Sequence, residues 1–487
     1  MSRWMGAAAA AVVGVAGLGT PAARAAERLD MPGFWQMVAD PARDRLVLST
    51  GKPGNSVRVV SASGVELTAI TGLDDPRGMA LSPDGSTLFV ALRSGNAVVG
   101  FDSTTLTETF RHDFGPGGCP TWLAPAGGKL YVGYNCQSGK GKLGSLDLRG
   151  AKPVFTGNLQ GVGFTSEPPL VRSVPGKPDL LVTADRSSVS LPYDSQVRVH
   201  DVSSGHPKVT AALPNSACTG LHDAVLTPDG SELILSCSYY SSERGASHRA
   251  YSTGDLSPAR TFPSASGPVV STTSPDGSLM IVGDSNGKDV STIHVERPDG
   301  SLVHRYDLPA NTFVERQGLT VMGRTLYAVT ENRKTGEFAL NLLSDYTKSG
   351  ATLEVTGPAS KSPGDAPVTV TGRLSFHSAT VTAPQRITVT RQSLSGSRSL
   401  PAVTTAADGT FTFRDVPVNG VKHVYTFGYP GDATHAAASD TAEVWISQLA
   451  PAITATAPAT AARGATIAIP GRVSFTDLST SAAVPVW

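Results

Sequence analysis

Charged and aromatic residues recur at equivalent places along this chain, each close to the start of an apolar strand in a repeated unit. Cations, carboxylates and aromatic rings gathered on one face can bind a polar ligand, because together they supply ion pairs, hydrogen bonds and stacking surfaces. We predict that these residues form a ligand-binding face. They are Arg77, Trp122, Glu167, His222, Asp223, Arg316 and Gln317.

Two features of this group could support catalysis. His222 and Asp223 could act as a general base with its orienting carboxylate, but neighbours on a strand point to opposite faces. A loop histidine bonded to backbone explains His222 as well. Acidic residues could supply oxygen ligands to a divalent ion, or could be solvated loop carboxylates. They are Glu167, Asp185, Asp284 and Glu331.

The two arginines of the group also have two interpretations. Arg77 and Arg316 could bind a carboxylate ligand, or could pair with Glu167 or Glu315. The chain contains no phosphate-binding loop before a helix, no G-x-S-x-G and no H-E-x-x-H. The sequence therefore favours binding over catalysis, and we assign no catalytic residue, no metal site and no cofactor.

A short repeated phrase shows which elements position these residues. Pro-Asp-Gly presets one φ angle, adds a side chain that bonds its own backbone and ends on a residue that takes positive φ, so each copy predicts a tight turn. Apolar strands follow each copy, and a spacing of roughly 40 to 50 residues is typical of a β-propeller. The copies are Ser82–Gly85, Thr227–Gly230 and Ser274–Gly277.

Aligning the chain on such turns gives seven candidate blades. The first-to-second strand turns of a blade lie on one face of the disc, and the connections that precede each first strand lie on the other. We therefore expect the ligand on the face opposite the Pro-Asp-Gly turns. The turns are at 40–44, 82–85, 125–128, 174–178, 227–230, 274–277 and 322–324.

One repeat resembles a known family. Residues 82–92, followed by Gly95-Asn96-Ala97-Val98 and 101–105, are similar to the YVTN repeats of secreted and cell-surface propellers. The Tyr-Val-Thr-Asn element itself is altered, to Phe-Val-Ala-Leu at 89–92 and Tyr-Ala-Val-Thr at 327–330. The resemblance implies a seven-bladed propeller over 27–349. It also raises an alternative, a lactonase-like hydrolase that uses a metal ion.

The composition shifts to Thr, Ala, Val and Ser around Ser349-Gly350. Short alternating strands with Gly- and Pro-rich turns over 350–448 predict an immunoglobulin-like β-sandwich. Ala407–Phe411 and Tyr429–His435 resemble bacterial Ig-like repeats. Residues 449–487 restart the pattern as an incomplete second repeat. Half a sandwich leaves an open edge, so either the natural chain continues beyond Trp487 or these strands lie on a neighbouring molecule, and we expect the first.

The N-terminus and the charge balance indicate where the protein acts. Residues 1–26 resemble a secretory signal, with Arg3, an apolar run over 6–18 and Ala23-Arg24-Ala25 as a cleavage site. That run is shorter than the roughly 20 residues that span a bilayer, so we expect no transmembrane segment in the mature chain. Forty basic residues balance forty acidic ones, which gives no electrostatic case for nucleic acid.

Export makes the four cysteines interpretable, because disulfides persist in oxidising compartments. Cys119 and Cys136 are placed symmetrically about the turn at Gly127-Gly128, and Cys218 and Cys237 about the turn at 227–230. We therefore predict the pairs 119–136 and 218–237. Taken together, the sequence predicts an exported or cell-surface binding protein whose Ig-like repeats act as a stalk. Its expected partner is an extracellular protein, glycan or small molecule.

Overall fold

The computed structural model describes residues 24–137, 141–150, 152–159, 164, 167–185, 197–213, 218–239, 247–263, 267–285, 291–358, 367–393, 396–417, 422–446 and 451–475. The chain divides into two compact units, Ala23–Gly350 and a second unit that begins at Ala351. Nearly all of the signal peptide predicted for 1–26 lies outside the described residues. The described residues include no helix of the length and hydropathy that a membrane-spanning segment requires.

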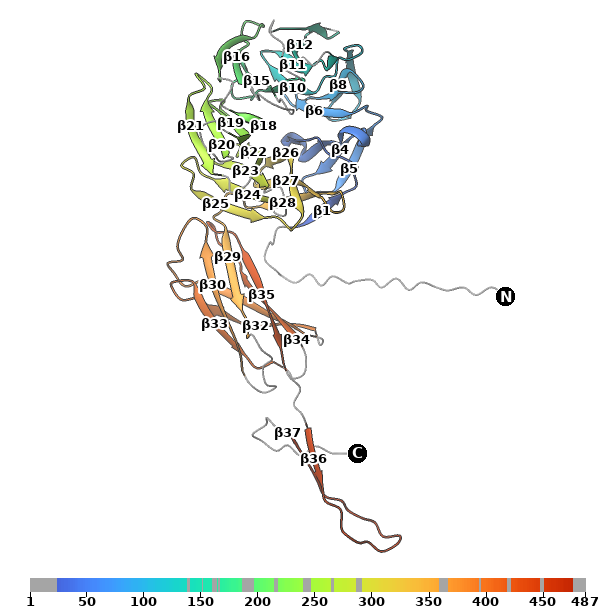
Figure 1. Cartoon of the computed structure of the whole chain (residues 1–487), viewed down its shortest axis with the longest axis vertical. Coiled ribbons are helices and arrows are strands. Elements are labelled where there is room, and N and C mark those ends of the chain that lie inside the picture. Colours follow the sequence, from blue (N-terminus) through green and yellow to red (C-terminus); the bar gives the residue numbers. More distant parts are fainter. Residues whose placement is uncertain are drawn as a thin grey trace, which may run out of the picture. The chain divides into compact units, whose positions relative to one another are not determined.

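The described strands of the first unit form seven four-stranded antiparallel sheets (Figure 1). The first sheet contains β2 (Gln36–Asp40), β3 (Arg45–Ser49), β4 (Ser56–Ser61) and β5 (Glu66–Thr71), with the short helices η1 (Pro41–Arg43) and α1 (Gly51–Gly54) between its strands. The second sheet contains β6 (Pro76–Leu81), β7 (Thr87–Leu92), β8 (Ala97–Asp102) and β9 (Glu108–Asp113). The third sheet contains β10 (Trp122–Ala126), β11 (Lys129–Tyr134), β12 (Lys142–Asp147) and β13 (Val154–Thr156).

The other four sheets are β14 (Leu170–Arg172), β15 (Leu180–Ala184), β16 (Val197–Asp201) and β17 (Lys208–Ala212); β18 (Thr219–Leu226), β19 (Glu232–Tyr239), β20 (Ser247–Ser252) and β21 (Pro258–Pro263); β22 (Gly267–Thr273), β23 (Met280–Ser285), β24 (Ser291–Glu296) and β25 (Leu302–Asp307); and β26 (Thr312–Met322), β27 (Thr325–Asn332), β28 (Glu337–Ser344) and β1 (Arg24–Leu29).

The sheets close into a ring around an axis. Each of the strands β2, β6, β10, β14, β18, β22 and β26 contacts the next, and β26 contacts β2. These are the inner strands. Each second strand is packed between neighbouring sheets, so β3 and β15 are buried along their whole length, whereas the outer strand β5 is largely exposed. Such a ring of sheets is a β-propeller, which confirms the class that the repeats predict.

The N-terminal strand completes the ring, a feature that the sequence pattern did not reveal. β1 pairs antiparallel with β28, with Glu27 opposite Leu340 and Leu29 opposite Phe338. One sheet is therefore built from both ends of the propeller segment. This pairing joins the first strand of the segment to its last three, so it closes the ring with backbone hydrogen bonds as well as side-chain packing.

The Pro-Asp-Gly turns form as predicted. In each, the aspartate accepts hydrogen bonds from the hydroxyl two residues before it and from the backbone N–H two residues after it. For Asp84 these come from Ser82 Oγ at 2.5 Å and Ser86 N at 3.0 Å. The bonds lower the pKa of Asp84 to about 2. The glycines that follow, Gly85, Gly230 and Gly277, have φ of 69°, 68° and 71°, a region that other residues rarely adopt.

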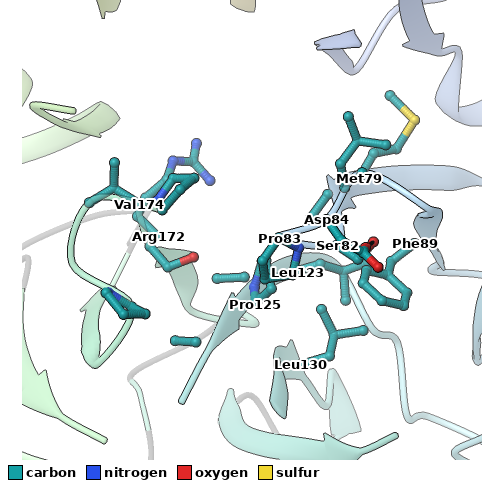
Figure 2. Close-up of a pocket in the computed structure, with 18 of the residues that line it drawn as sticks. Met79, Ser82, Pro83, Asp84, Phe89, Leu123, Pro125, Leu130, Arg172 and Val174 are labelled. Carbon is teal, nitrogen blue, oxygen red and sulfur yellow. Dashed lines mark hydrogen bonds between the residues drawn. The ribbon is translucent and has the colours of Figure 1, made fainter. Parts of the chain in front are cut away.

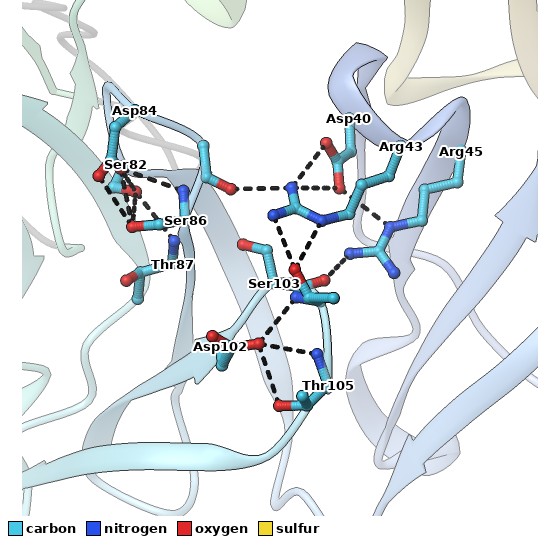
Figure 3. Close-up of polar contacts among 12 residues, drawn as sticks. Asp40, Arg43, Arg45, Ser82, Asp84, Ser86, Thr87, Asp102, Ser103 and Thr105 are labelled. Atoms are coloured by element: carbon cyan, nitrogen blue, oxygen red, sulfur yellow. Dashed lines mark hydrogen bonds and ion pairs between the residues drawn. The ribbon is translucent and has the colours of Figure 1, made fainter.

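Arginines tie the first sheet to the second at these turns (Figure 3). Arg43 donates to the carbonyl oxygen of Gly85 at 2.9 Å, and Arg45 donates to the carbonyl oxygen of Ser103. Asp40 holds both guanidinium groups, at 3.3 Å from Arg43 Nη1 and 2.9 Å from Arg45 Nε. The turn of one sheet is thus fixed against its neighbour by charge-assisted bonds.

Both predicted disulfides are present. Cys119 bonds Cys136 and Cys218 bonds Cys237, with Cα–Cα distances of 5.7 and 5.6 Å, and no free cysteine remains. Each bond joins the residues that precede an inner strand to the end of the hairpin that follows. The disulfides therefore lie on the side of the disc opposite the Pro-Asp-Gly turns.

The second unit contains a β-sandwich. Its buried side chains, such as Leu353, Val370, Phe411 and Tyr425, form one core shared by two sheets. One sheet is β29 (Ala351–Thr356), β30 (Val368–Phe376) and β33 (Thr410–Asp415); the other is β32 (Gly396–Thr404), β31 (Arg386–Ser393), β34 (Lys422–Tyr429) and β35 (Ala438–Trp445). All seven strands lie within 350–448, the segment where the sequence predicts short alternating strands.

A separate hairpin follows the sandwich, made of β36 (Pro451–Ala455) and β37 (Gly471–Phe475). Ala455 faces Gly471 in it, as Val355 faces Gly372 in the first hairpin of the sandwich. The sequence parallel between the two segments is therefore matched by the same pairing register.

Removal of β1 tests the ring closure. A protein that begins at Asp30 loses the β1–β28 ladder and exposes Leu340, so we expect a clearly lower urea midpoint for the propeller transition. The control is Val154→Thr, at an outer-strand residue that is 61% exposed. Equal midpoints for the shortened and the complete protein would show that β28 alone closes the ring.

Candidate functional site

Aromatic rings and a guanidinium group stack near the beginnings of the inner strands. The guanidinium carbon of Arg77 lies 4.1 Å from the ring centre of Trp35, and the ring centres of Trp35 and Trp122 are 5.7 Å apart. Asp75 orients Arg77 through a hydrogen bond of 3.0 Å from Nε. Arg77 and Trp122 belong to the predicted ligand-binding face, and Trp35 joins them.

A buried polar cluster continues this arrangement through Arg172, which lies 5.2 Å from the ring centre of Trp122. Arg172 donates to Asp223 Oδ1 at 3.3 Å and to Gln317 Oε1, while Gln317 Nε2 donates to the same Asp223 oxygen. We call these three residues the axial cluster. They come from β14, β18 and β26, so the cluster links three inner strands that are far apart in sequence.

Backbone groups satisfy the rest of the Asp223 carboxylate. Its Oδ1 accepts from Ala224 N at 2.8 Å and its Oδ2 from Ser271 N, on β22, at 3.2 Å. Asp223 is 1% exposed. A buried carboxylate needs a cation and several donors to offset its lost hydration, and the axial cluster supplies both.

A cavity of about 790 Å³ opens where the inner strands end, on the side of the Pro-Asp-Gly turns (Figure 2). We call it the turn-side cavity. Turns of four successive sheets surround it, and each contributes a proline: Pro41, Pro83, Pro125 and Pro175. Figure 2 shows Arg172 and Val174 on one side and Met79 and Phe89 on the other. Apolar side chains dominate the wall, and Arg172 and Gln317 bring the axial cluster to it.

The charged groups of the turn-side cavity are already bonded within the protein. Asp40 forms ion pairs with two arginines, and Asp84 accepts the hydrogen bonds of its own turn. Lys129 Nζ donates to the carbonyl oxygen of Gly205 at 2.9 Å. Arg172 is paired with Asp223. The cavity therefore offers an apolar surface with a few polar groups, each of which already forms a hydrogen bond or ion pair within the protein.

A second pocket, of about 260 Å³, lies near the beginnings of β18, β22 and β26. We call it the strand-start pocket. His222, Arg316 and Arg333 line it together with Glu315, whose pKa is raised to about 7 by burial and by the nearby Glu331. Pro268, Val269, Phe313 and Val314 form an apolar part of the wall.

The structure thus divides the predicted ligand-binding face into three groups. Arg77 and Trp122 stack on Trp35, and Asp223 and Gln317 belong to the axial cluster. His222 and Arg316 line the strand-start pocket. Glu167 pairs with Arg93 at 3.2 Å, apart from the pockets. Whether these residues bind a ligand stays a prediction.

Three residues of these groups are not predicted from the sequence, namely Trp35, Arg172 and Arg333, and Glu315 is predicted only as a possible partner of Arg316. Arg172 ends β14, a strand of three residues, and a bulge separates Val314 from Leu319 in β26. The pattern of alternating apolar residues cannot show which side chains such short or irregular strands turn toward the axis. One signal was available, because Arg172 directly follows the apolar pair Leu170-Val171.

A serine, a histidine and an aspartate form a buried chain between the fifth and sixth sheets. His248 Nδ1 lies 2.8 Å from Ser236 Oγ, and His248 Nε2 lies 3.1 Å from Asp284 Oδ1. The order of groups is that of a hydrolase triad. All three residues have 0% exposure, so a substrate cannot reach the serine, and the chain holds the two sheets together.

The possible metal ligands do not gather. Asp284 contacts His248, and Glu167 contacts Arg93. The part of the chain that the structure describes has no group of three or more His, Cys, Asp or Glu side chains placed to share a metal ion.

Comparison with known proteins finds similarity among solved structures only. No family model matches the chain, and no curated protein matches it. Similar solved structures include the hydrazine synthase of Kuenenia stuttgartiensis, at 17% identity, 65% of this chain, 97% of that chain and a TM-score of 0.48. A chain of a mitotic checkpoint complex is 18% identical, covers 71% of this chain and 98% of its own length, and has a TM-score of 0.49. KlHsv2 with loop 6CD replaced by a Gly-Ser linker is 12% identical, covers 64% of this chain and 97% of its own length, and has a TM-score of 0.42.

The axial cluster yields a stability prediction. Arg172→Met removes the cation from the buried Asp223 carboxylate, so we expect a loss of about 3 kcal/mol or more in the free energy of unfolding. Urea denaturation of the two proteins measures this loss. Arg149→Met is the matched control, because Arg149 also pairs with an aspartate but its side chain is 77% exposed. A loss as small as the control's would contradict a structural role for the cluster.

Proposed function

We propose that this protein is an exported binding protein, a seven-bladed β-propeller that takes a ligand on its axis and carries Ig-like repeats as a stalk. The observation that supports binding best is the turn-side cavity. Its volume of about 790 Å³ falls within the roughly 300–1,000 Å³ of small-molecule sites, and such sites are mostly apolar with a few polar groups.

The chemistry of the wall defines the ligand class. Asp40 and Arg172 are held in ion pairs, and Asp84 and Lys129 already bond neutral groups, so a charged ligand would have to displace existing bonds to replace its hydration. The preferred ligand is largely apolar and uncharged, with one or two hydrogen-bonding groups that reach Gln317 or Arg172. The prolines at the mouth keep the cavity preformed, which lowers the conformational cost of binding.

This proposal differs in place from the sequence prediction, which put the ligand on the face opposite the Pro-Asp-Gly turns. From the sequence alone, those turns are expected to be structural elements only. Their side chains do form the turns, but four of the turns also surround the axis at close range and enclose the cavity between them.

Export and the stalk extend the proposal to the whole chain. Two disulfides are compatible with an oxidising compartment. The sandwich of three- and four-stranded sheets has the size and alternation of an Ig-like domain, and the β36–β37 hairpin repeats its first pairing. We propose that residues 350–448 form one Ig-like repeat and that 449–487 begin another.

A cavity-filling substitution tests the binding proposal. Val174 is half-buried on the cavity wall, so Val174→Trp should block the ligand, whereas Val209→Trp, at an exposed position on β17, should not. The measurement is the thermal midpoint with a panel of uncharged, drug-sized amphiphilic molecules. We expect at least one compound to raise the midpoint of the natural protein and of the control, but not of Val174→Trp. A shift that persists in Val174→Trp would place binding elsewhere.

The alternative is a lactonase-like hydrolase with a metal ion. We expect the purified protein to open no lactone in a panel of aliphatic and sugar lactones, with or without added divalent ions. Turnover that a chelator abolishes would establish the alternative and overturn the binding proposal. His222→Ala together with Arg316→Ala would then show whether the strand-start pocket performs the reaction.

A further inference from the structure

The strand-start pocket contains charged groups that act on one another without a direct ion pair among the described residues. Most arginines of the propeller are within ion-pair distance of a carboxylate, as Arg77 and Arg172 are. Glu315 and Arg316 form no hydrogen bond or ion pair through their side chains with any residue that the structure describes. The guanidinium group of Arg333 lies over the Phe313 ring, 3.8 Å from its centre.

The pocket therefore presents two guanidinium groups and one carboxyl group to the same small volume. A cation held near an open pocket without a carboxylate partner attracts an anion, and guanidinium groups fit planar carboxylates with two parallel hydrogen bonds. Pro268, Val269 and Val314 add an apolar wall, which a carbon skeleton can contact and inorganic phosphate cannot.

We propose that the strand-start pocket is a second binding site, specific for a compact aliphatic carboxylate, with Arg316 and Arg333 holding the anion and the protonated side chain of Glu315 donating a hydrogen bond to it. This site is separate from the turn-side cavity and does not depend on the function proposed for it. The volume of about 260 Å³ limits the ligand to an acid with a short carbon chain.

The charged neighbours of Glu315 decide when it carries a proton. Burial raises its pKa most, Glu331 on β27 raises it further, and Arg333 and Arg316 lower it. On β18, His222 lines the pocket and Asp223 is held in the axial cluster. Two further strands that contact β26 carry titratable residues. Asp284 on β23 contacts His248, and His294 on β24 lies beside Glu296 of the same strand. β22 also contacts β26 but has no titratable residue. Asp40, on β2, pairs with Arg43 and Arg45.

At a pH above the pKa of Glu315, binding of the carboxylate requires Glu315 to take up a proton. A simple carboxylic acid stays ionised above a pH of about 5, so only the Glu315 proton limits binding between pH 6 and 8.5. With a pKa of about 7 in the free protein, the affinity should be constant at lower pH and fall by up to about tenfold for each pH unit above 7, until the pH reaches the higher pKa that Glu315 has in the complex. Glu315→Gln keeps a hydrogen-bond donor without a titrating proton, so its affinity should not change with pH.

The test uses the full chain and 3-methylbutanoate as the probe, with 3-methylbutanamide as the uncharged analogue and inorganic phosphate as the second anion. Ligand-observed NMR titrations at pH 5.5, 7.0 and 8.5 give the dissociation constants. We expect the carboxylate to bind at least tenfold more tightly than the amide and phosphate at pH 5.5, and to weaken at pH 8.5. Arg316→Gln and Arg333→Gln should each weaken it tenfold or more.

Three controls separate the site from general effects. Arg297→Gln removes an exposed turn arginine and should change nothing. His222→Ala should keep the pH dependence, which assigns it to Glu315. Val174→Trp should leave the carboxylate affinity unchanged, because it fills the other cavity. Near-ultraviolet circular dichroism checks that each variant is folded.

The outcomes that overturn the proposal are equally specific. Binding of phosphate as tight as that of the carboxylate would show a general anion site. The same pH dependence in Glu315→Gln as in the natural protein would remove Glu315 from the site. Absence of measurable carboxylate binding at pH 5.5 would show that the arginines have no ligand role.

Discussion

The buried contact of Arg172 with Asp223 and Gln317 is the interaction on which the arrangement of the axis depends. Asp223 also takes a backbone N–H from Ser271, so one carboxylate joins four inner strands. Neighbouring sheets of a propeller touch mainly through apolar side chains, which permit small rotations. Directional bonds to one buried charge fix the strands relative to one another. Both pockets depend on this constraint. Gln317 lines the turn-side cavity, and Glu315, two residues earlier on the same strand, lines the strand-start pocket.

The two ends of the propeller axis differ in chemistry, because the residues at the beginning of each inner strand differ in type from those at its end. Where the strands end, tight turns need proline, aspartate, serine and glycine, and those polar groups bond one another, as Asp84 bonds Ser82 and Ser86. The surface left to the turn-side cavity is largely apolar. Where the strands begin, residues such as Glu315 and Arg316 are not required by a turn, and their side chains line the strand-start pocket.

The sequence predicted those parts of the fold that depend on local chemistry. The Pro-Asp-Gly turns, both disulfides and the hairpin positions follow from residues within about 20 positions of one another, and the structure confirms them. β1 was missed because its pairing with β28 spans the whole propeller. For the same reason the sequence placed Asp223 and Gln317 on one face but could not find Arg172, which joins them from a third strand. The turn-side cavity depends on distances between turns, which no local pattern contains.

The central claim is that the propeller axis has two ligand sites of different chemistry at its two ends. Anomalous diffraction from crystals soaked separately in bromobenzene and in 3-bromopropanoate at pH 5.5 tests it directly. The account predicts a bromine peak from bromobenzene among Met79, Phe89 and Val174, and a peak from 3-bromopropanoate beside Arg316 and Arg333. Both peaks in one pocket, or peaks only on the outer surface of the blades, would contradict it.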